Sequence, residues 1–179
     1  MVTIIFESHA TTKDNESHLT SSTYDVELTN LGQQQAAELG QRYTNKHIDA
    51  IFCPDTQRSY TTAVIAFGDQ FPIVQDERLR ECNYGDYTRH SIDKIHELKL
   101  QYIDKPFPGG ESIRDAFDRV NDFLSFLLKN YNGKTIMIIA DHGIQQALDH
   151  WIKGLPIDQI VSQRWSWQPG WFYELNQNA

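Results

Sequence analysis

Short apolar runs alternate with helical patterns along the chain, and this alternation predicts an α/β fold. Strands are expected at five places: residues 3–6, 49–52, 71–74, 134–140 and 171–175. The run at residues 134–140 is continuously apolar, which is typical of a parallel strand covered on both faces. We therefore expect a three-layer α/β/α sandwich with a mostly parallel central sheet.

Polar residues that cap helices mark where several of the intervening helices begin. Ser112 and Asp115 have the spacing of a capping box and open the strongest apolar stripe, which continues to Leu128. Thr29 is the expected N-cap of an earlier helix, and residues 142–153 predict a later one. Another helix is expected to start with Asp55 as its N-cap, and residues 92–100 predict one more.

The size and charge of the chain limit what it can bind. Its 179 residues suit a single domain spanning 1–179, and its net charge of -8 argues against a general binder of nucleic acid or anionic membranes. No apolar run approaches the ~20 residues of a membrane span, and residues 1–7 lack a signal-peptide pattern. We expect a cytoplasmic protein without nucleic-acid or membrane partners and with two reduced, buried thiols, Cys53 and Cys82; a homodimer is left open.

Two histidines and one arginine come within six residues after predicted strands that lie far apart in the sequence. His9, Arg58 and His142 follow the strands at 3–6, 49–52 and 134–140. Ligands of open α/β sheets bind beyond the carboxyl ends of the strands, so these side chains are expected at one rim. Arg58 also lies in a first helical turn, where the helix dipole disfavours a cation and a bound anion would offset that cost.

Six sequence blocks, in order, resemble the motifs of the histidine phosphatase superfamily, which includes the phosphoglycerate mutases. The segment from Phe6 to Asn15 resembles its L-V-R-H-G-E-T-x-x-N opening. The other five blocks are residues 25–36, similar to D-x-x-L-T-x-x-G-x-x-Q-A; 55–63, similar to S-D-L-x-R-A-x-x-T-A; 79–85, similar to L-x-E-x-x-x-G; 108–112, similar to P-x-G-E-S; and 141–143, similar to S-H-G. Together they cover nearly the whole chain.

This resemblance implies a mechanism without a metal or another cofactor. His9 would be the nucleophile that forms a phosphohistidine, since a neutral imidazole attacks phosphorus with its free lone pair. Glu81 would protonate the leaving alcohol and then activate water. Arg58 and His142 would hold the phosphoryl oxygens, while Ser8, Asn15 and Ser21 are further candidates for substrate binding.

The chain departs from the family pattern around the nucleophile. Ser8 stands where the family has arginine, and residues 9–16 resemble the H-A-T-T-x-D-N-E opening of a divergent branch. Loss of one preorganised donor can cost about 10²–10³ in rate. Lys13 is a candidate replacement cation, and Arg80 a weaker one because neighbours on an extended segment face opposite ways. For the same geometric reason Asp141 is expected to point away from the site.

The pattern is most consistent with a phosphatase that acts on a small phosphorylated metabolite, specifically a phosphomonoester. One alternative is phosphoryl transfer of the phosphoglycerate mutase type. The other is a catalytically weak relative that binds a phosphate ligand, which Ser8 motivates. The segment 165–171, which carries three tryptophans, is expected to be a packed turn into the last strand rather than a substrate wall.

Overall fold

A five-stranded sheet with the order β3-β2-β4-β1-β5 forms the centre of the molecule. In this computed structural model, which describes residues 1–176, the strands are β1 Val2–Ser8, β2 Ala50–Cys53, β3 Ile73–Gln75, β4 Thr135–Ala140 and β5 Trp171–Leu175. Neighbouring strands are parallel except β1 and β5, which are antiparallel. The expected mostly parallel sheet is confirmed, with the third strand at 73–75 instead of 71–74.

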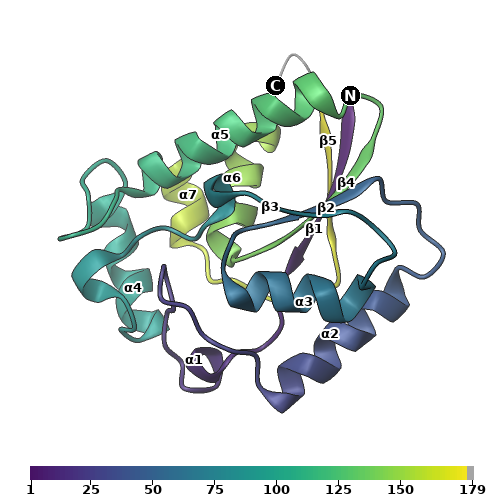
Figure 1. Ribbon diagram of the computed structural model, residues 1–179. Coiled ribbons are helices and arrows are strands. Elements are labelled where there is room, and N and C mark those ends of the chain that lie inside the picture. Colours follow the sequence, from purple (N-terminus) through teal and green to yellow (C-terminus); the bar gives the residue numbers. More distant parts are fainter. Residues whose placement is uncertain (177–179) are drawn as a thin grey trace.

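Helices cover both faces of this sheet (Figure 1). Their bounds are α1 Lys13–Glu16, α2 Asn30–Arg42, α3 Gln57–Phe67, α4 Ile92–Leu98, α5 Ile113–Asn130, α6 His142–Lys153 and α7 Ile157–Ser162. Three short 3₁₀ helices span Glu77–Leu79, Gly85–Tyr87 and Lys99–Tyr102. The helices α2 and α3 lie on one face, and α5 and α6 on the other, which makes the predicted three layers.

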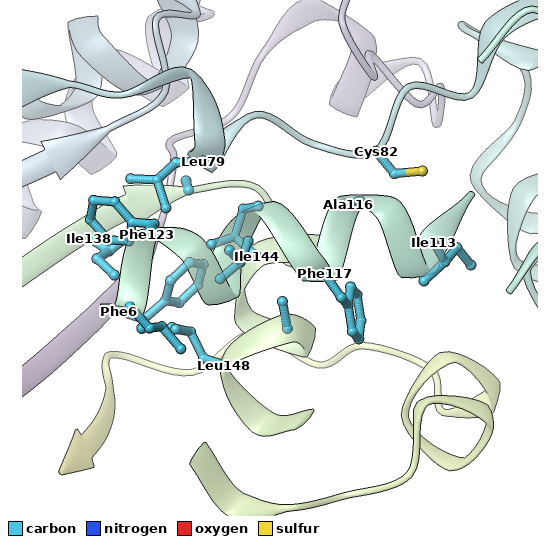
Figure 2. Packing of buried hydrophobic residues seen from close by; sticks show 14 of the residues in the cluster. Phe6, Leu79, Cys82, Ile113, Ala116, Phe117, Phe123, Ile138, Ile144 and Leu148 are labelled. Carbon is cyan, nitrogen blue, oxygen red and sulfur yellow. The ribbon is translucent and has the colours of Figure 1, made fainter. Parts of the chain in front are cut away.

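Alternate side chains of the strands enter two separate cores. Ile4 and Phe6 of β1 pack with the apolar stripe of α5 and with Leu148 of α6 (Figure 2). Ile5 of β1 and Met137 of β4 point the other way, against α2 and α3. Residues on successive positions of a strand face opposite sides, so one continuous apolar run supplies both cores. These cores fix the strands whose ends carry the site.

Side-chain caps define several helix starts as the sequence predicts. Ser112 and Asp115 form the capping box of α5, and the Thr29 hydroxyl accepts from the Gly32 amide at the start of α2. The expectation for Asp55 is wrong. The N-cap of α3 is Thr56, and the Asp55 carboxylate is instead an ion-pair partner of Arg80. A bidentate guanidinium bond satisfies that carboxylate better than a single amide does.

Two further features bear on the sequence predictions. Both Cys53 and Cys82 are free and buried, as expected. Across residues 1–176, no helix combines the length and the apolar composition that a membrane crossing requires.

Candidate active site

A cavity of about 690 Å³ opens beyond the carboxyl ends of β1 and β4. Ser8 and His9 reach it from the end of β1, and Asp141 and His142 reach it from the end of β4. Ser8 pairs with Ala140 in the parallel register, so the residues after these two strands emerge side by side. Two imidazoles that are 133 positions apart in the sequence therefore line one cavity, as the strand-end argument predicts.

A hydrogen bond on one side and a close carboxylate contact on the other orient the His9 ring. Its Nδ1–H donates to the carbonyl oxygen of Ala10 at 2.7 Å, because a carbonyl can only accept. Its Nε2 lies 3.2 Å from Oδ1 of Asp141. The Ala10 contact makes Nε2 the nitrogen that faces the cavity, which is the orientation a nucleophilic imidazole needs.

Asp141 corrects one expectation from the sequence. Instead of pointing away, its carboxylate accepts from Nε of Arg58 at 3.0 Å and from Nη2 at 2.9 Å, besides its contact with His9. Asp141 is the N-cap residue of α6 but makes no side-chain cap bond, so its carboxylate is available to Arg58 and His9. Burial opposes the charged form, yet Arg58 and His9 hold the pKa of Asp141 well below its usual range.

Arg58 is fully buried and its guanidinium is engaged by the protein. Besides Asp141, it donates from Nη2 to the carbonyl oxygen of Ser22 at 2.8 Å and from Nη1 to that of Tyr24 at 3.1 Å. Asp141 balances the charge of Arg58, and the anion at the start of α3 is the Asp25 carboxylate, whose Oδ1 accepts from the Gln57 amide at 2.9 Å. Arg58 lies behind the cavity wall and orients Asp141 and the 22–24 loop.

Backbone amides fix the Glu81 carboxylate at the edge of the cavity. Oε1 accepts from the Cys82 amide at 2.7 Å, and Oε2 accepts from the Gly143 amide at 3.0 Å. A Cβ on residue 143 would lie 2.1 Å from Glu81 Oε1, so only glycine leaves room for this contact. The S-H-G-like block thus holds the predicted acid next to the second histidine.

A second pair of residues holds the segment that carries Glu81. Arg119 of α5 donates to the carbonyl oxygens of Arg78, Arg80 and Glu81, and its guanidinium pairs with Glu111 at 2.6 Å. Glu111 in turn accepts from the Asn83 amide at 2.9 Å. The glutamate of the P-x-G-E-S-like block therefore orients the loop of the L-x-E-like block.

His142 is a half-buried imidazole beside Trp165, with ring centroids 5.4 Å apart. Burial lowers its pKa well below the usual value, and electrostatic interactions with Lys99 and His96 act in the same direction, while Asp141 opposes them. The ring is therefore neutral at pH 7, where it can donate one hydrogen bond from a single ring nitrogen.

The other predicted binding residues also line the cavity. The Ser8 hydroxyl donates to the His9 carbonyl at 3.3 Å, and that of Ser21 donates to Asp14 at 3.2 Å. Asn15 uses its Oδ1 to accept from the amide and hydroxyl of Thr12, and this orients its amide group. The NH2 group of Asn15 is thereby left as a neutral hydrogen-bond donor in the cavity wall.

The two proposed replacements for the missing arginine lie elsewhere. Lys13 is exposed and pairs with Glu27 at 2.9 Å, while Arg80 pairs with Asp55. Neither residue lines the cavity. Their carboxylate partners on the surface explain the difference, because each cation is satisfied where it stands.

The tryptophan segment differs in part from the expectation of a packed turn. Trp171 of β5 packs edge-on against Phe6, with centroids 5.7 Å apart, as expected. Trp165 and Trp167, however, are exposed and line the cavity. Trp165 stacks on Trp171 at 6.3 Å, and Arg42 lies 5.9 Å from the ring of Trp167. Of these three tryptophans, only Trp171 packs against the buried core.

Sequence reasoning missed several contributors to the cavity wall. Among them are Asp141 as an ion-pair partner, Lys99, and Glu7, whose carboxylate accepts from the buried Tyr43 hydroxyl at 2.7 Å. Glu7 stands immediately before Ser8 and His9 in the sequence, and this position is the signal that could have identified it. Across residues 1–176, no group of three His, Cys, Asp or Glu side chains is arranged to hold a metal ion.

Comparison with known proteins shows the family of the chain. The model of the histidine phosphatase superfamily (branch 1) matches residues 4–171. The chain belongs to this superfamily, and its function is of the phosphatase or phosphoglycerate mutase-like kind.

Individual relatives carry both kinds of name. Phosphoserine phosphatase 1 of Hydrogenobacter thermophilus is 26% identical over 149 residues, which are 78% of this chain and 71% of that protein. A probable phosphoglycerate mutase GpmB of Salmonella choleraesuis is 31% identical over 166 residues, 87% of this chain and 77% of that protein. The solved structure of Bacillus stearothermophilus YhfR superposes with a TM-score of 0.85 at 26% identity, covering 99% of this chain and 93% of that one.

Proposed function

We propose that this protein is a metal-independent phosphatase that hydrolyses a small phosphomonoester through a phosphohistidine on His9. The observation that carries the proposal is the orientation of His9, whose Nδ1–H is held by the Ala10 carbonyl while Nε2 faces the cavity. That contact selects the ring nitrogen that attacks phosphorus.

In the first step, Nε2 of His9 forms a bond to phosphorus as the bond to the leaving alcohol oxygen breaks. Glu81, at the edge of the same cavity, donates the proton that the leaving alkoxide needs. In the second step, water attacks the phosphohistidine, Glu81 takes the water's proton, and phosphate and free His9 result. The two amides on Glu81 keep its carboxyl group in place for both steps.

Neutral donors support the phosphoryl group in this scheme. The His142 imidazole and the Asn15 amide line the cavity and donate to non-bridging oxygens, while Ser8 and Ser21 contribute hydroxyl groups. Arg58 acts from behind the wall through Asp141. Because Asp141 Oδ1 lies beside Nε2, the carboxylate has to yield its contact with His9 when a phosphoryl group approaches.

Hydrolysis of p-nitrophenyl phosphate in the presence of EDTA tests the proposal. We expect turnover by the wild type, loss of at least about 10³-fold in kcat for His9→Ala, and no change for His47→Ala, whose side chain is 81% exposed. A neutral-pH quench followed by mass spectrometry should detect phosphate on His9. Equal rates for wild type and His9→Ala would refute the assigned nucleophile.

A substrate panel separates the alternatives. The relatives named phosphoserine phosphatase suggest O-phosphoserine as a test phosphomonoester. The relatives named probable phosphoglycerate mutase favour a mutase as the second candidate, and isomerisation of 3-phosphoglycerate stimulated by 2,3-bisphosphoglycerate would support it. Phosphate binding without turnover on any substrate would instead favour a non-catalytic binding protein, for which Ser8 is the motivating residue.

A further inference from the structure

The arginines and lysines that line the cavity differ in whether an acidic side chain already balances them. Arg42 pairs with Glu7 at 3.3 Å, and Arg164 pairs with Asp93 at 2.9 Å. Lys99, the third lining cation, has no carboxylate within salt-bridge distance among residues 1–176. Its Nζ donates to a neutral oxygen, Oε1 of Gln146, at 3.1 Å. Lys99 is therefore the cation in this wall whose charge is uncompensated.

Lys99 also lies on the side of the cavity where the proposed chemistry takes place. Its Nζ donates to Gln146, which lies one turn after His142 on α6, and the charge of Lys99 contributes to the lowered pKa of that imidazole. With Glu81 and Gly143, Lys99 also borders a small hollow that adjoins the main cavity. The ammonium is thus near both the second histidine and the proposed acid.

A phosphoryl group in this cavity needs a positive charge that the other residues do not provide. The charge of Arg58 is neutralised by the bidentate pair with Asp141, and its side chain is fully buried. Ser8 carries no charge, and the depressed pKa leaves His142 neutral. Phosphoryl transfer depends mainly on positioning and on stabilising charge at the oxygens, so one accessible cation is required.

We propose that the ammonium group of Lys99 binds a non-bridging oxygen of the substrate's phosphoryl group. This inference rests on the proposed phosphatase function at His9. Lys99 begins the 3₁₀ helix Lys99–Tyr102, which follows α4 directly, so the cation comes from outside the strand ends that carry His9 and His142. A lysine suits this role because its flexible stem lets the charge follow the oxygen. On binding, Nζ exchanges the Gln146 amide oxygen for a charged acceptor.

Calorimetric titration with inorganic phosphate tests this role without requiring turnover. Lys99→Gln should weaken phosphate binding about tenfold or more, since a hydrogen bond between charged groups is lost, and Lys99→Arg should restore most of the affinity. Lys94→Gln is the matched control, because Lys94 lies on α4 with Glu97 as its partner and does not line the cavity. Unchanged phosphate affinity in Lys99→Gln would overturn the proposal.

Kinetics then separate this inference from the function on which it rests. With p-nitrophenyl phosphate, whose leaving group carries no carboxylate, Lys99→Gln should lower kcat/KM about tenfold or more. A loss confined to O-phosphoserine or 3-phosphoglycerate would overturn the assignment, because Lys99 would then bind the carboxylate of the leaving group. If His9→Ala is inactive while Lys99→Gln equals the wild type, only the Lys99 inference fails. If His9→Ala equals the wild type, the proposed function fails.

A second substitution provides a rescue test at the position of the missing arginine. Ser8 lines the same cavity, next to His9. Ser8→Arg should recover phosphate affinity in the Lys99→Gln background and add less in the wild type, because the two cations would serve the same anion. Equal gains in both backgrounds would contradict a shared role.

Discussion

Asp141 and Arg58 form a two-pronged ion pair directly behind the proposed nucleophile. Oδ1 of Asp141 lies 3.0 Å from Nε of Arg58 and 3.2 Å from Nε2 of His9, so one oxygen contacts both groups. The second oxygen, Oδ2, lies 2.9 Å from Nη2. An approaching phosphoryl group competes with this carboxylate for Nε2. Asp141 therefore links the charge of the buried guanidinium to the state of the reactive imidazole.

Replacing Asp141 should strengthen phosphate binding while weakening the fold. In Asp141→Asn the competing negative charge is gone, and we expect calorimetry to show phosphate affinity increased about tenfold. The same change leaves the Arg58 charge buried without its counter-ion. It should lower the free energy of unfolding by about 3 kcal/mol in phosphate-free urea titrations. Adding phosphate should then raise the free energy of unfolding more in Asp141→Asn than in the wild type.

The matched control for this change is Asp149→Asn. Asp149 lies on the same helix, α6, where it pairs with Lys153 and the Tyr173 hydroxyl away from the cavity. Its replacement should leave phosphate affinity unchanged. Weaker phosphate binding in Asp141→Asn would mean that the Asp141 carboxylate orients Arg58 or His9 for the ligand rather than competing with it.

A methyl group at position 143 should displace Glu81 without disturbing the rest of the site. In Gly143→Ala the new Cβ would lie 2.1 Å from Oε1 of Glu81, so the carboxylate has to leave the Gly143 amide. We expect kcat for p-nitrophenyl phosphate to fall about 10²-fold, the lower range for loss of a general acid, with phosphate affinity changed less than threefold. An unchanged kcat in Gly143→Ala would argue against Glu81 as the acid.

The sequence predicts the scaffold well because each element has a local signal. The continuous apolar run of β4 and the stripe and cap of α5 depend on nearest neighbours and on burial, both of which are readable from the chain. The shared rim for His9 and His142 follows from parallel pairing of β1 and β4. What local patterns could not supply was the direction of a side chain at a strand end.

Asp141 and Lys99 show why part of the site escaped prediction. The direction of Asp141 is determined by Arg58, which lies 83 positions earlier in the chain, and no spacing rule encodes that pairing. Lys99 enters the cavity from a segment without catalytic motifs, which is held in place by the buried Ile95 and Leu98 of α4. Long-range ion pairs and loop packing are tertiary properties, so they emerge only once the cores have fixed the elements.

The neutral state of His142 should make the fold sensitive to mild acid. Burial lowers the pKa of His142 in the folded protein below its unfolded value of about 6.5. Below that pH the unfolded chain takes up a proton that the folded protein does not, so the free energy of unfolding falls as the pH decreases. The loss approaches about 1 kcal/mol for each pH unit below 6.

Urea titrations of the wild type and of His142→Asn between pH 7.5 and pH 5 isolate this contribution. The groups that face the imidazole, Lys99, His96 and Asp141, are present in both proteins, as is the buried Glu7 carboxyl with its raised pKa. The titrations of these groups cancel to first order when the two proteins are compared. Between pH 6 and pH 5, the free energy of unfolding should therefore fall by about 1 kcal/mol less in His142→Asn than in the wild type. His47→Asn, at an exposed position, should follow the wild type. Parallel curves for wild type and His142→Asn would show that His142 takes up its proton as readily in the folded protein as in the unfolded chain.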